Sequence, residues 1–407
     1  MKVCVVGLGY IGLPTAIMLA AHGVEVVGVD SSASRLETLR NHVIPFEENG
    51  MAELFQRALE SRIAFDSHCP STDMYIVSVP TPYLAKSKQI DPAFVLAAIR
   101  DVLQVCPQNA VIVIESTISP GTIDRYVRPE VERCGFRCGK DIHIVHAPER
   151  IIPGNMVYEL QHNNRVIGTD DPAVGESVKA VYKSFCQGDV VITSIRTAEM
   201  TKVVENTYRD VNIAYANELM KICRQDDMDV YEIIRIANMH PRVNILQPGP
   251  GVGGHCISVD PWFLVGDYPG LAKLILQART INDSIPDFVL ERIGSIMEKN
   301  HITDVRRVGL YGLTYKENVD DTRESPTLQL LESMKRHLST GIRVYDPMVK
   351  RDLVPNQYHD LDAFLTDVDM VVVMVGHNEL KACEEKLAGK VVLDTRNVLK
   401  LPQVYHL

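Results

Sequence analysis

Short apolar runs rich in β-branched residues alternate with longer amphipathic stretches through the first half of the chain. The apolar runs predict strands and most of the stretches between them predict helices, which is the pattern of a parallel sheet with crossover helices. The predicted strands lie at residues 2–6, 25–29, 74–79, 111–115 and 143–146. Pro80-Thr81-Pro82 and Ser116-Thr117 end two of these strands, so we expect both at the carboxyl edge of the sheet, where open α/β sheets bind ligands.

The pattern changes near Arg196. Residues 197–224 contain no Pro or Gly and are rich in Ala, Met, Glu and Lys, so we expect one long helix there. Helical patterns at 230–239 and 271–300 flank a glycine-rich loop, and strands alternate with helices again from Asp304, at 307–311, 343–345, 370–375 and 391–394. The fold predicted is α/β: Rossmann-like parallel-sheet domains at 1–195 and 304–407, joined by a helical middle domain at 196–303 with a long central helix.

The composition narrows the class of protein. Hydrophobic residues make up 46% and charged residues 23% of the chain, the balance of a globular enzyme. No apolar run approaches the roughly 18–20 residues of a membrane span. The first residues fit a strand followed by a turn rather than a signal peptide, so we expect a cytoplasmic protein with no membrane association. The net charge of −10 argues against nucleic-acid binding. Nine cysteines without a Cys-x-x-Cys pair predict free thiols and no metal site.

A dinucleotide-binding fingerprint follows the first predicted strand. Gly7-Leu8-Gly9-Tyr10-Ile11-Gly12 fits G-x-G-x-x-G and opens a helical stretch at 13–22, and the next strand ends at Asp30. The helix N-terminus would face a pyrophosphate, and Asp30 would accept hydrogen bonds from a ribose hydroxyl while repelling a 2′-phosphate, which favours NAD over NADP. The pattern alone leaves one alternative, a Rossmann-like domain that binds another nucleotide or none.

Cys256 is the candidate nucleophile. It follows Gly253-Gly254-His255, and Asp260 lies four residues further on, on the same face if a helix begins there. Backbone N–H groups near the thiol would lower its pKa and allow it to attack a carbonyl. The local sequence by itself favours the other interpretation, a buried and inert cysteine before a helix, with His255 structural.

Lys202, Asn206 and Arg209 form a polar stripe on the predicted long helix, at i, i+4 and i+7. Such a stripe is more often a solvated face. The functional alternative is that a lysine close to a reacting oxygen stabilises the negative charge that develops there.

Seven motifs occur in order along the chain and together resemble the UDP-glucose/GDP-mannose dehydrogenase family over essentially its whole length. They are the fingerprint, Val79-Pro80-Thr81-Pro82, Glu115-Ser116-Thr117, Ala147-Pro148-Glu149-Arg150, Lys202 with Asn206, Gly253-Gly254-His255-Cys256 with Asp260, and Gly312-Leu313-Thr314-Tyr315-Lys316 followed by Asp321-Thr322-Arg323-Glu324-Ser325-Pro326. Within the family, residues 205–214 and 240–256 are similar to the branch that oxidises UDP-N-acetyl-D-mannosamine.

The resemblance implies a two-step, four-electron oxidation of a UDP-sugar C6 alcohol to the uronate, with two NAD molecules reduced. Cys256 would capture the intermediate aldehyde as a thiohemiacetal and then carry a thioester that water releases. Lys202 and Asn206 would stabilise charge on the C6 oxygen, and Asp260 would act as base or position the water. Thr117 and Glu149 would place the reacting group or that water.

Further contacts are carried over from the family in the same way. NAD would be held by Gly7, Gly9, Tyr10, Ile11, Gly12, Asp30, Thr81, Thr117 and Arg323. The UDP sugar would be held by Glu149, Arg150, Lys202, Asn206, Arg209, Gly253 and Lys316, with Arg242 as a contact from a neighbouring subunit. The long helix would form the core of a homodimer. Three rivals stay open: the same chemistry on UDP-N-acetylglucosamine or UDP-glucose, a catalytically inactive nucleotide-sugar-binding protein, and a two-electron alcohol dehydrogenase with an idle Cys256.

Overall fold

The computed structural model describes residues 2–46, 48–254, 256–336 and 341–407, and the chain divides into two units. Unit 1 comprises Met1–Glu205 and Trp262–Pro269, and unit 2 comprises Asn206–Pro261 and Gly270–Leu407. Two helices, α8 (Ile195–Gln225) and α10 (Asp260–Asp267), contribute residues to both units. The expected division into three domains at residues 195 and 303 stays a prediction.

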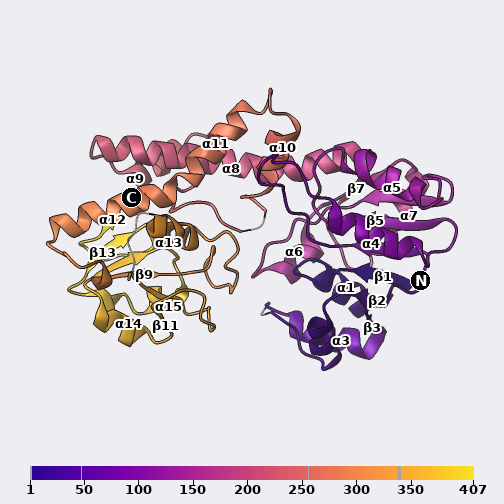
Figure 1. Cartoon of the computed structure of the whole chain (residues 1–407), viewed down its shortest axis with the longest axis horizontal. Coiled ribbons are helices and arrows are strands. Elements are labelled where there is room, and N and C mark those ends of the chain that lie inside the picture. Colours follow the sequence, from indigo (N-terminus) through magenta and orange to yellow (C-terminus); the bar gives the residue numbers. More distant parts are fainter. Residues whose placement is uncertain (1, 47, 255, 337–340) are drawn as a thin grey trace. The chain divides into compact units, whose positions relative to one another are not determined.

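Eight strands of the described chain form the sheet of unit 1, in the order β3-β2-β1-β4-β5-β6-β7-β8 (Figure 1). Neighbouring strands pair in parallel except β6 and β7, which are antiparallel. The strands are β1 (Lys2–Val6), β2 (Glu25–Val29), β3 (Ile63–Asp66), β4 (Met74–Val77), β5 (Ala110–Ile114), β6 (Ile142–His146), β7 (Arg165–Thr169) and β8 (Val190–Thr193). The strand order reverses between β1 and β4, and ligands of open α/β sheets bind beyond the carboxyl ends of strands at such a point.

The helices of unit 1 cross between these strands. They are α1 (Gly12–Ala21), α2 (Ala33–Arg40), α3 (Met51–Ser61), α4 (Ala93–Leu103), a π-helix (Ile123–Val127) that runs into α5 (Arg128–Arg133), α6 (Met156–His162) and α7 (Pro172–Tyr182). Apolar residues of α1, α3, α6 and α7 pack against one face of the sheet, where they meet Val3 and Val5. The central strands β4 and β5 are buried along their whole length, as expected for a sheet covered on both faces.

The predicted strands of this unit are confirmed, two at the expected bounds and three with one or both bounds differing by one or two residues. The pattern did not predict β3, β7 and β8. These strands are short, and polar, glycine or exposed positions interrupt their apolar character.

The sheet of unit 2 contains six strands of the described chain, in the order β11-β10-β9-β12-β13-β14, and all pairs are parallel (Figure 1). The strands are β9 (Val308–Tyr311), preceded by a 3₁₀ turn (Val305–Arg307), β10 (Arg343–Tyr345), β11 (Gln357–Tyr358), β12 (Met370–Val373), β13 (Val391–Asp394) and β14 (Tyr405–His406). This confirms a second Rossmann-like parallel sheet.

Two apolar clusters lie on the two faces of this sheet. On one face α8, α9 (Val230–Ala237), α12 (Ile285–Lys299) and α13 (Pro326–Arg336) pack against Leu310 and Val372. On the other face α14 (Leu361–Asp367), α15 (Asn378–Ala382) and a 3₁₀ turn (Glu384–Leu387) pack against Val371 and Val373. Alternate side chains of β12 therefore pack into two different apolar clusters, one on each face of the sheet.

The long central helix is confirmed, because α8 runs for 31 residues (Figure 1). The helical stretch expected at 271–300 divides into α11 (Lys273–Asp283) and α12 at Ser284. Pro286 lies in the first turn of α12, where it needs no hydrogen-bonded N–H but cannot continue the preceding helix. Among the described residues, no helix is long and apolar enough to cross a membrane.

Candidate functional site

The glycine turn after β1 lies where the strand order of unit 1 reverses. Gly7 has a φ of +92°, and a Cβ there would lie 2.5 Å from the carbonyl oxygen of Ser78. A Cβ at Gly12 would lie 1.9 Å from the carbonyl oxygen of Gly7. Both positions therefore require glycine, whereas no described atom lies within 4 Å of a Cβ at Gly9. The open space at Gly9 is what the close approach of a pyrophosphate needs.

The N-terminus of α1 completes an anion site of this kind. No described side chain caps α1, and its first turn contains no acidic residue. The first N–H groups of a helix lack partners within the helix and favour negative charge. Gly7, Gly9 and Gly12, with the adjoining Tyr10 and Ile11, thus fit the phosphates of a dinucleotide.

Asp30 follows β2 at the same edge of the sheet. Its Oδ1 accepts a hydrogen bond from the backbone N–H of Ser32 at 2.8 Å, and its Oδ2 accepts one from the N–H of Leu8 at 2.9 Å. The second bond joins the carboxylate to the glycine turn. Asp30 is therefore held beside the turn, as a ribose acceptor requires.

Arg35 is a part of this site that the sequence analysis missed. Its Nη1 donates to Asp30 Oδ2 at 3.0 Å, and the Arg35 side chain is half-exposed. The ion pair places a cation near the predicted ribose position and helps to fix the carboxylate. The available signal was an arginine in the first turn of the helix that follows the acid.

The loops after β4 and β5 are joined by side chains of the predicted motifs. Thr81 Oγ1 donates to the carbonyl oxygen of Thr117 at 2.6 Å. Ser116 Oγ accepts from the N–H of Val79 at 2.8 Å and donates to its carbonyl oxygen at 2.7 Å. The structure thus brings Thr81 and Thr117 together at the carboxyl edge of the sheet, beside the glycine turn.

Glu149 follows β6 and is buried, with both carboxylate oxygens engaged. Its Oε1 accepts from the N–H of Arg150 at 2.7 Å, and its Oε2 accepts from Arg165 Nη2 on β7. The Arg150 side chain is paired with Glu205, at 2.8 Å. A substrate contact by Arg150 would therefore compete with Glu205.

On α8, Lys202 and Asn206 lie one helical turn apart and are both buried. The expectation of a solvated polar stripe is wrong for these two residues, because position along the helix does not reveal which face neighbouring segments cover. Arg209 is half-buried, and its Nε has no described hydrogen-bond partner.

Glu199 fixes the beginning of α8 within unit 1. Its carboxylate accepts hydrogen bonds from the N–H groups of Gly121, at 2.5 Å, and Ile123, at 3.0 Å. Both donors belong to the segment that follows Thr117. Glu199 therefore anchors α8 to this segment less than one turn before Lys202.

Cys256 is exposed, so the expectation of a buried position is wrong, and its role as a nucleophile stays a prediction. The N–H of Asp260 donates to the carbonyl oxygen of Cys256 at 2.9 Å, and α10 begins at Asp260, so Cys256 lies one turn before the helix. Asn206 Nδ2 donates to Asp260 Oδ2 at 2.6 Å, and both side chains are buried. Within unit 2, Asn206 and Asp260 are thus in direct contact, and Cys256 precedes Asp260 by one turn.

The glycines before Cys256 have a different purpose from the one expected. The N–H of Gly254 donates to the carbonyl oxygen of Arg323 at 2.9 Å, so it is not directed at the thiol. A Cβ at Gly253 would lie 2.6 Å from the carbonyl oxygen of Glu324 and 2.7 Å from Tyr315 Cβ. The glycines allow the loop to pack closely on the segment after β9, which carries the motif at 312–326.

Two further residues lie at the start of this loop and were missed from the sequence. Asn217 Oδ1 accepts from the N–H of Gly249 at 3.0 Å, from a buried position on α8. Arg396 Nη1 lies 3.0 Å from the place of a Gly249 Cβ, and its Nε donates to the carbonyl oxygen of Met374 at 3.0 Å. Burial lowers the pKa of this guanidinium, against the raising effects of Tyr231, Glu317 and Asp394.

The remaining predicted contacts of unit 2 are partly exposed. Arg323 forms hydrogen bonds with Asp321 at 2.6–3.1 Å, so a contact with NAD phosphates would compete with that carboxylate. Arg242 is exposed in the loop after α9, and Lys316 is half-buried after β9. Thr314 Oγ1 donates to the carbonyl oxygen of Lys316 at 2.9 Å and fixes the backbone there.

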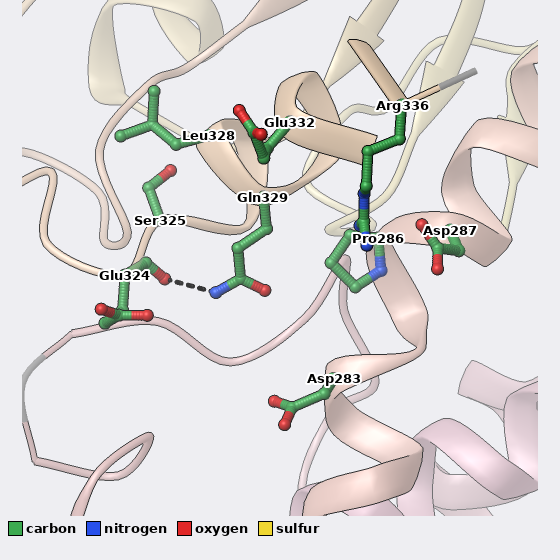
Figure 2. Close-up of a pocket in the computed structure, with 9 residues that line it drawn as sticks. All are labelled: Asp283, Pro286, Asp287, Glu324, Ser325, Leu328, Gln329, Glu332 and Arg336. Carbon is green, nitrogen blue, oxygen red and sulfur yellow. Dashed lines mark hydrogen bonds between the residues drawn. The ribbon is translucent and has the colours of Figure 1, made fainter. Parts of the chain in front are cut away.

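A cavity of about 430 Å³ lies between α12, α13 and the segment before α13 (Figure 2). Its lining includes four acidic residues and one arginine: Asp283, Asp287, Glu324, Glu332 and Arg336. Gln329 Nε2 donates to the carbonyl oxygen of Glu324 across one side of it, at 3.0 Å. The excess of carboxylates would repel a pyrophosphate, so this cavity does not suit a dinucleotide or a UDP sugar.

The predicted catalytic residues are divided between the units. Unit 1 contains Thr117, Glu149 and Lys202, and unit 2 contains Asn206, Cys256 and Asp260. Within unit 2 the structure brings Asn206 and Asp260 together one turn from Cys256.

Comparison with known proteins identifies three consecutive matches along the chain. Residues 1–186 match the NAD binding domain of the UDP-glucose/GDP-mannose dehydrogenase family, residues 196–284 its central domain, and residues 309–401 its UDP binding domain.

Similar proteins cover nearly the whole chain. A UDP-N-acetyl-D-mannosamine dehydrogenase of Methanococcus vannielii is 41% identical over 410 residues, which cover 98% of this chain and 93% of the relative. The structure of the UDP-N-acetyl-mannosamine dehydrogenase of Staphylococcus aureus has a TM-score of 0.90 at 41% identity, covering 100% of this chain and 98% of that one. The corresponding Pyrococcus horikoshii structure has a TM-score of 0.92 at 35% identity, covering 100% and 99%.

Proposed function

Because the chain belongs to the UDP-glucose/GDP-mannose dehydrogenase family, we propose that it oxidises the C6 alcohol of UDP-N-acetyl-D-mannosamine to the carboxylate of UDP-N-acetyl-D-mannosaminuronate. The observation that carries the proposal is the exposed Cys256, one turn before a buried Asp260 that Asn206 holds. The choice of sugar is supported by relatives of this name at 41% identity over nearly full length.

The glycine turn, Asp30, Thr81 and Thr117 are the residues that would hold NAD, which would supply the hydride acceptor for each of two oxidations. The first oxidation converts the C6 alcohol to an aldehyde with loss of a hydride and a proton. The Cys256 sulfur then adds to the aldehyde carbon, and the resulting thiohemiacetal carries the hydrogen that the second oxidation removes. Water attacks the thioester and releases the carboxylate and the free thiol.

The residues near these steps have matching chemistry. Lys202 supplies a buried positive charge that stabilises the C6 oxygen when it becomes negative, and Asn206 donates a second hydrogen bond. Asp260 accepts the proton of the attacking water or orients that water. Thr117 and Glu149 position the reacting group from unit 1. Arg150, Arg209, Gly253 and Lys316 contact the UDP sugar, Arg242 does so from a neighbouring subunit, and Arg323 contacts NAD.

The test is a substrate panel in which NADH is counted per sugar consumed. We expect two NADH per molecule of UDP-N-acetyl-D-mannosamine and little turnover of UDP-N-acetylglucosamine or UDP-glucose. Brisk turnover of another sugar would overturn the choice of substrate. One NADH per sugar would identify a two-electron alcohol dehydrogenase, and NAD binding without any NADH would identify an inactive binding protein.

We further propose that α8 forms the core of a homodimer. Four large apolar side chains, spaced four or seven residues apart, are 46–62% exposed along one side of this helix: Val204, Tyr208, Tyr215 and Ile222. A periodic apolar stripe of this size on a helix is typical of a face that meets another subunit. The nine cysteines, scattered along the chain without a Cys-x-x-Cys pair, also support the cytoplasm, a reducing compartment, as the location.

Tyr215→Glu is expected to dissociate this dimer, because it places a charge in the centre of the stripe. We expect the dissociation constant to rise by more than about tenfold, as for an aromatic anchor near the middle of an interface. Sedimentation equilibrium measures it. Gln225→Glu adds the same charge at the exposed end of α8, outside the stripe, and serves as the control. Equal dissociation constants for the two variants would place the subunit contact elsewhere.

A further inference from the structure

A buried cluster of charges lies within unit 1 around Arg165, the first residue of β7. The side chains of Arg165, Glu115 and Glu149 are 0–4% exposed. One guanidinium therefore faces two carboxyl groups away from water. A single guanidinium can balance only one negative charge, so ionisation of Glu115 adds a charge for which Arg165 must be shared.

Arg165 contacts Glu149 more closely than Glu115. Its Nη2 donates to Glu149 Oε2, whereas its Nη1 lies 3.9 Å from Glu115 Oε1. The ring of Tyr182 lies under the guanidinium, with the Arg165 Cζ 4.3 Å from the ring centre. This stacking holds the guanidinium plane in place.

Glu115 is surrounded by hydroxyl groups from three other elements. Thr15 of α1 and Ser78 after β4 donate to it at about 3.2 Å, and Tyr182 of α7 donates at 3.1 Å. Ser78 is also the residue against which Gly7 and Gly12 of the glycine turn pack. Glu115 thus contacts Ser78, on which the predicted cofactor turn packs, and Arg165 lies near both Glu115 and Glu149.

We propose that Arg165 is the positioning residue for the Glu149 carboxylate, and that ionisation of Glu115 weakens this hold. Neutral Glu115 leaves the guanidinium to Glu149. Ionised Glu115 is a second anion that competes for the same guanidinium. The inference rests on the proposed function, since it concerns the step that Glu149 assists.

The pH at which Glu115 begins to compete with Glu149 for Arg165 lies near neutrality. Burial, and after it the charge of Glu149, raises the pKa of Glu115 to about 7, against the lowering effects of Arg165, Tyr182 and Thr15. Below this pH Glu115 is neutral, and above it Glu115 brings a negative charge to the side of Arg165. Steps that depend on a fixed Glu149 should therefore slow in the wild type as the pH rises through neutrality.

Glu115→Gln tests this directly, because glutamine keeps the shape and cannot ionise. The measurement is the rate of uronate release from the Cys256 thioester by rapid quench, between pH 6 and 8.5. We expect the variant and the wild type to have equal rates at pH 6, and the variant to be faster by about threefold or more at pH 8.5. A rate ratio that does not change with pH would overturn the proposal.

Tyr182→Phe provides a second, milder variant. It keeps the ring under Arg165 but removes a hydroxyl that stabilises ionised Glu115, so the pH at which the wild-type rate falls should move upward. An unchanged midpoint would contradict the proposal. The infrared band of a protonated carboxyl group, present at pH 6 in the wild type and missing in Glu115→Gln, reports the same ionisation without turnover. Absence of NADH in the wild type with every sugar would refute the proposed function, which the infrared titration distinguishes from failure of this inference.

Discussion

Cys256→Ser is expected to abolish formation of the uronate while the first oxidation still takes place. The hydroxyl of serine is a far weaker nucleophile than a thiolate, so the aldehyde is not converted into a tetrahedral adduct that can lose a second hydride. We expect uronate formation to fall by a factor of at least about 1,000. The readout is the NADH yield per sugar in a single turnover, which should fall from two to one.

Cys134→Ser is the matched control, because Cys134 is the other exposed cysteine of the described chain. It should leave the yield at two NADH and the rate unchanged. Uronate formation at the wild-type rate by Cys256→Ser would exclude the covalent route and leave Cys256 without a role in catalysis.

Lys202→Met is expected to have the second large effect, and on both oxidations. Methionine fills most of the buried volume of the lysine chain but removes its charge, so the C6 oxygen loses the cation that stabilises it. We expect each hydride transfer to slow by about 100–1,000-fold, the range found when one donor to a developing oxyanion is removed. Stopped-flow absorbance of NADH measures the two transfers separately.

Lys221→Met on the same helix provides the comparison. Lys221 is half-buried, and its Nζ donates at 3.0 Å to Ser284 Oγ, a residue outside the predicted site. This variant should transfer hydride at the wild-type rate. If it loses as much activity as Lys202→Met, the loss reflects damage to α8 rather than missing charge at the reacting oxygen.

The fold followed from the sequence because its signals are local. Short runs that were either alternately or fully apolar predicted the central strands. A long stretch without Pro or Gly predicted α8. The glycine turn and Asp30 were predictable for the same reason, since strand, turn, helix and terminal acid lie within the first 30 residues. These elements are consecutive in the chain and adjacent in the fold, so a local pattern is enough to predict them.

The partners of the site residues were not predictable, because they come from distant parts of the chain. Glu149 is 16 residues from Arg165, and Asn206 is 54 residues from Asp260. The burial of side chains could not be predicted either. Lys202 was expected to be solvated and Cys256 to be buried, and both expectations were wrong. The covering of a helix face or a loop is a tertiary property that residue spacing does not contain.

The geometry around Asp30 also limits how the enzyme could be redesigned. The obvious route to an NADP-dependent form would be to replace this acid with a small or basic residue. Asp30 also accepts the N–H groups of Leu8 and Ser32 and pairs with Arg35. Its removal would leave two backbone N–H groups without an acceptor and Arg35 without its carboxylate, beside the turn that must bind the phosphates. Coenzyme preference and the rigidity of the turn are thus properties of one carboxylate, and a change of coenzyme would need a replacement acceptor for Leu8 at the same time.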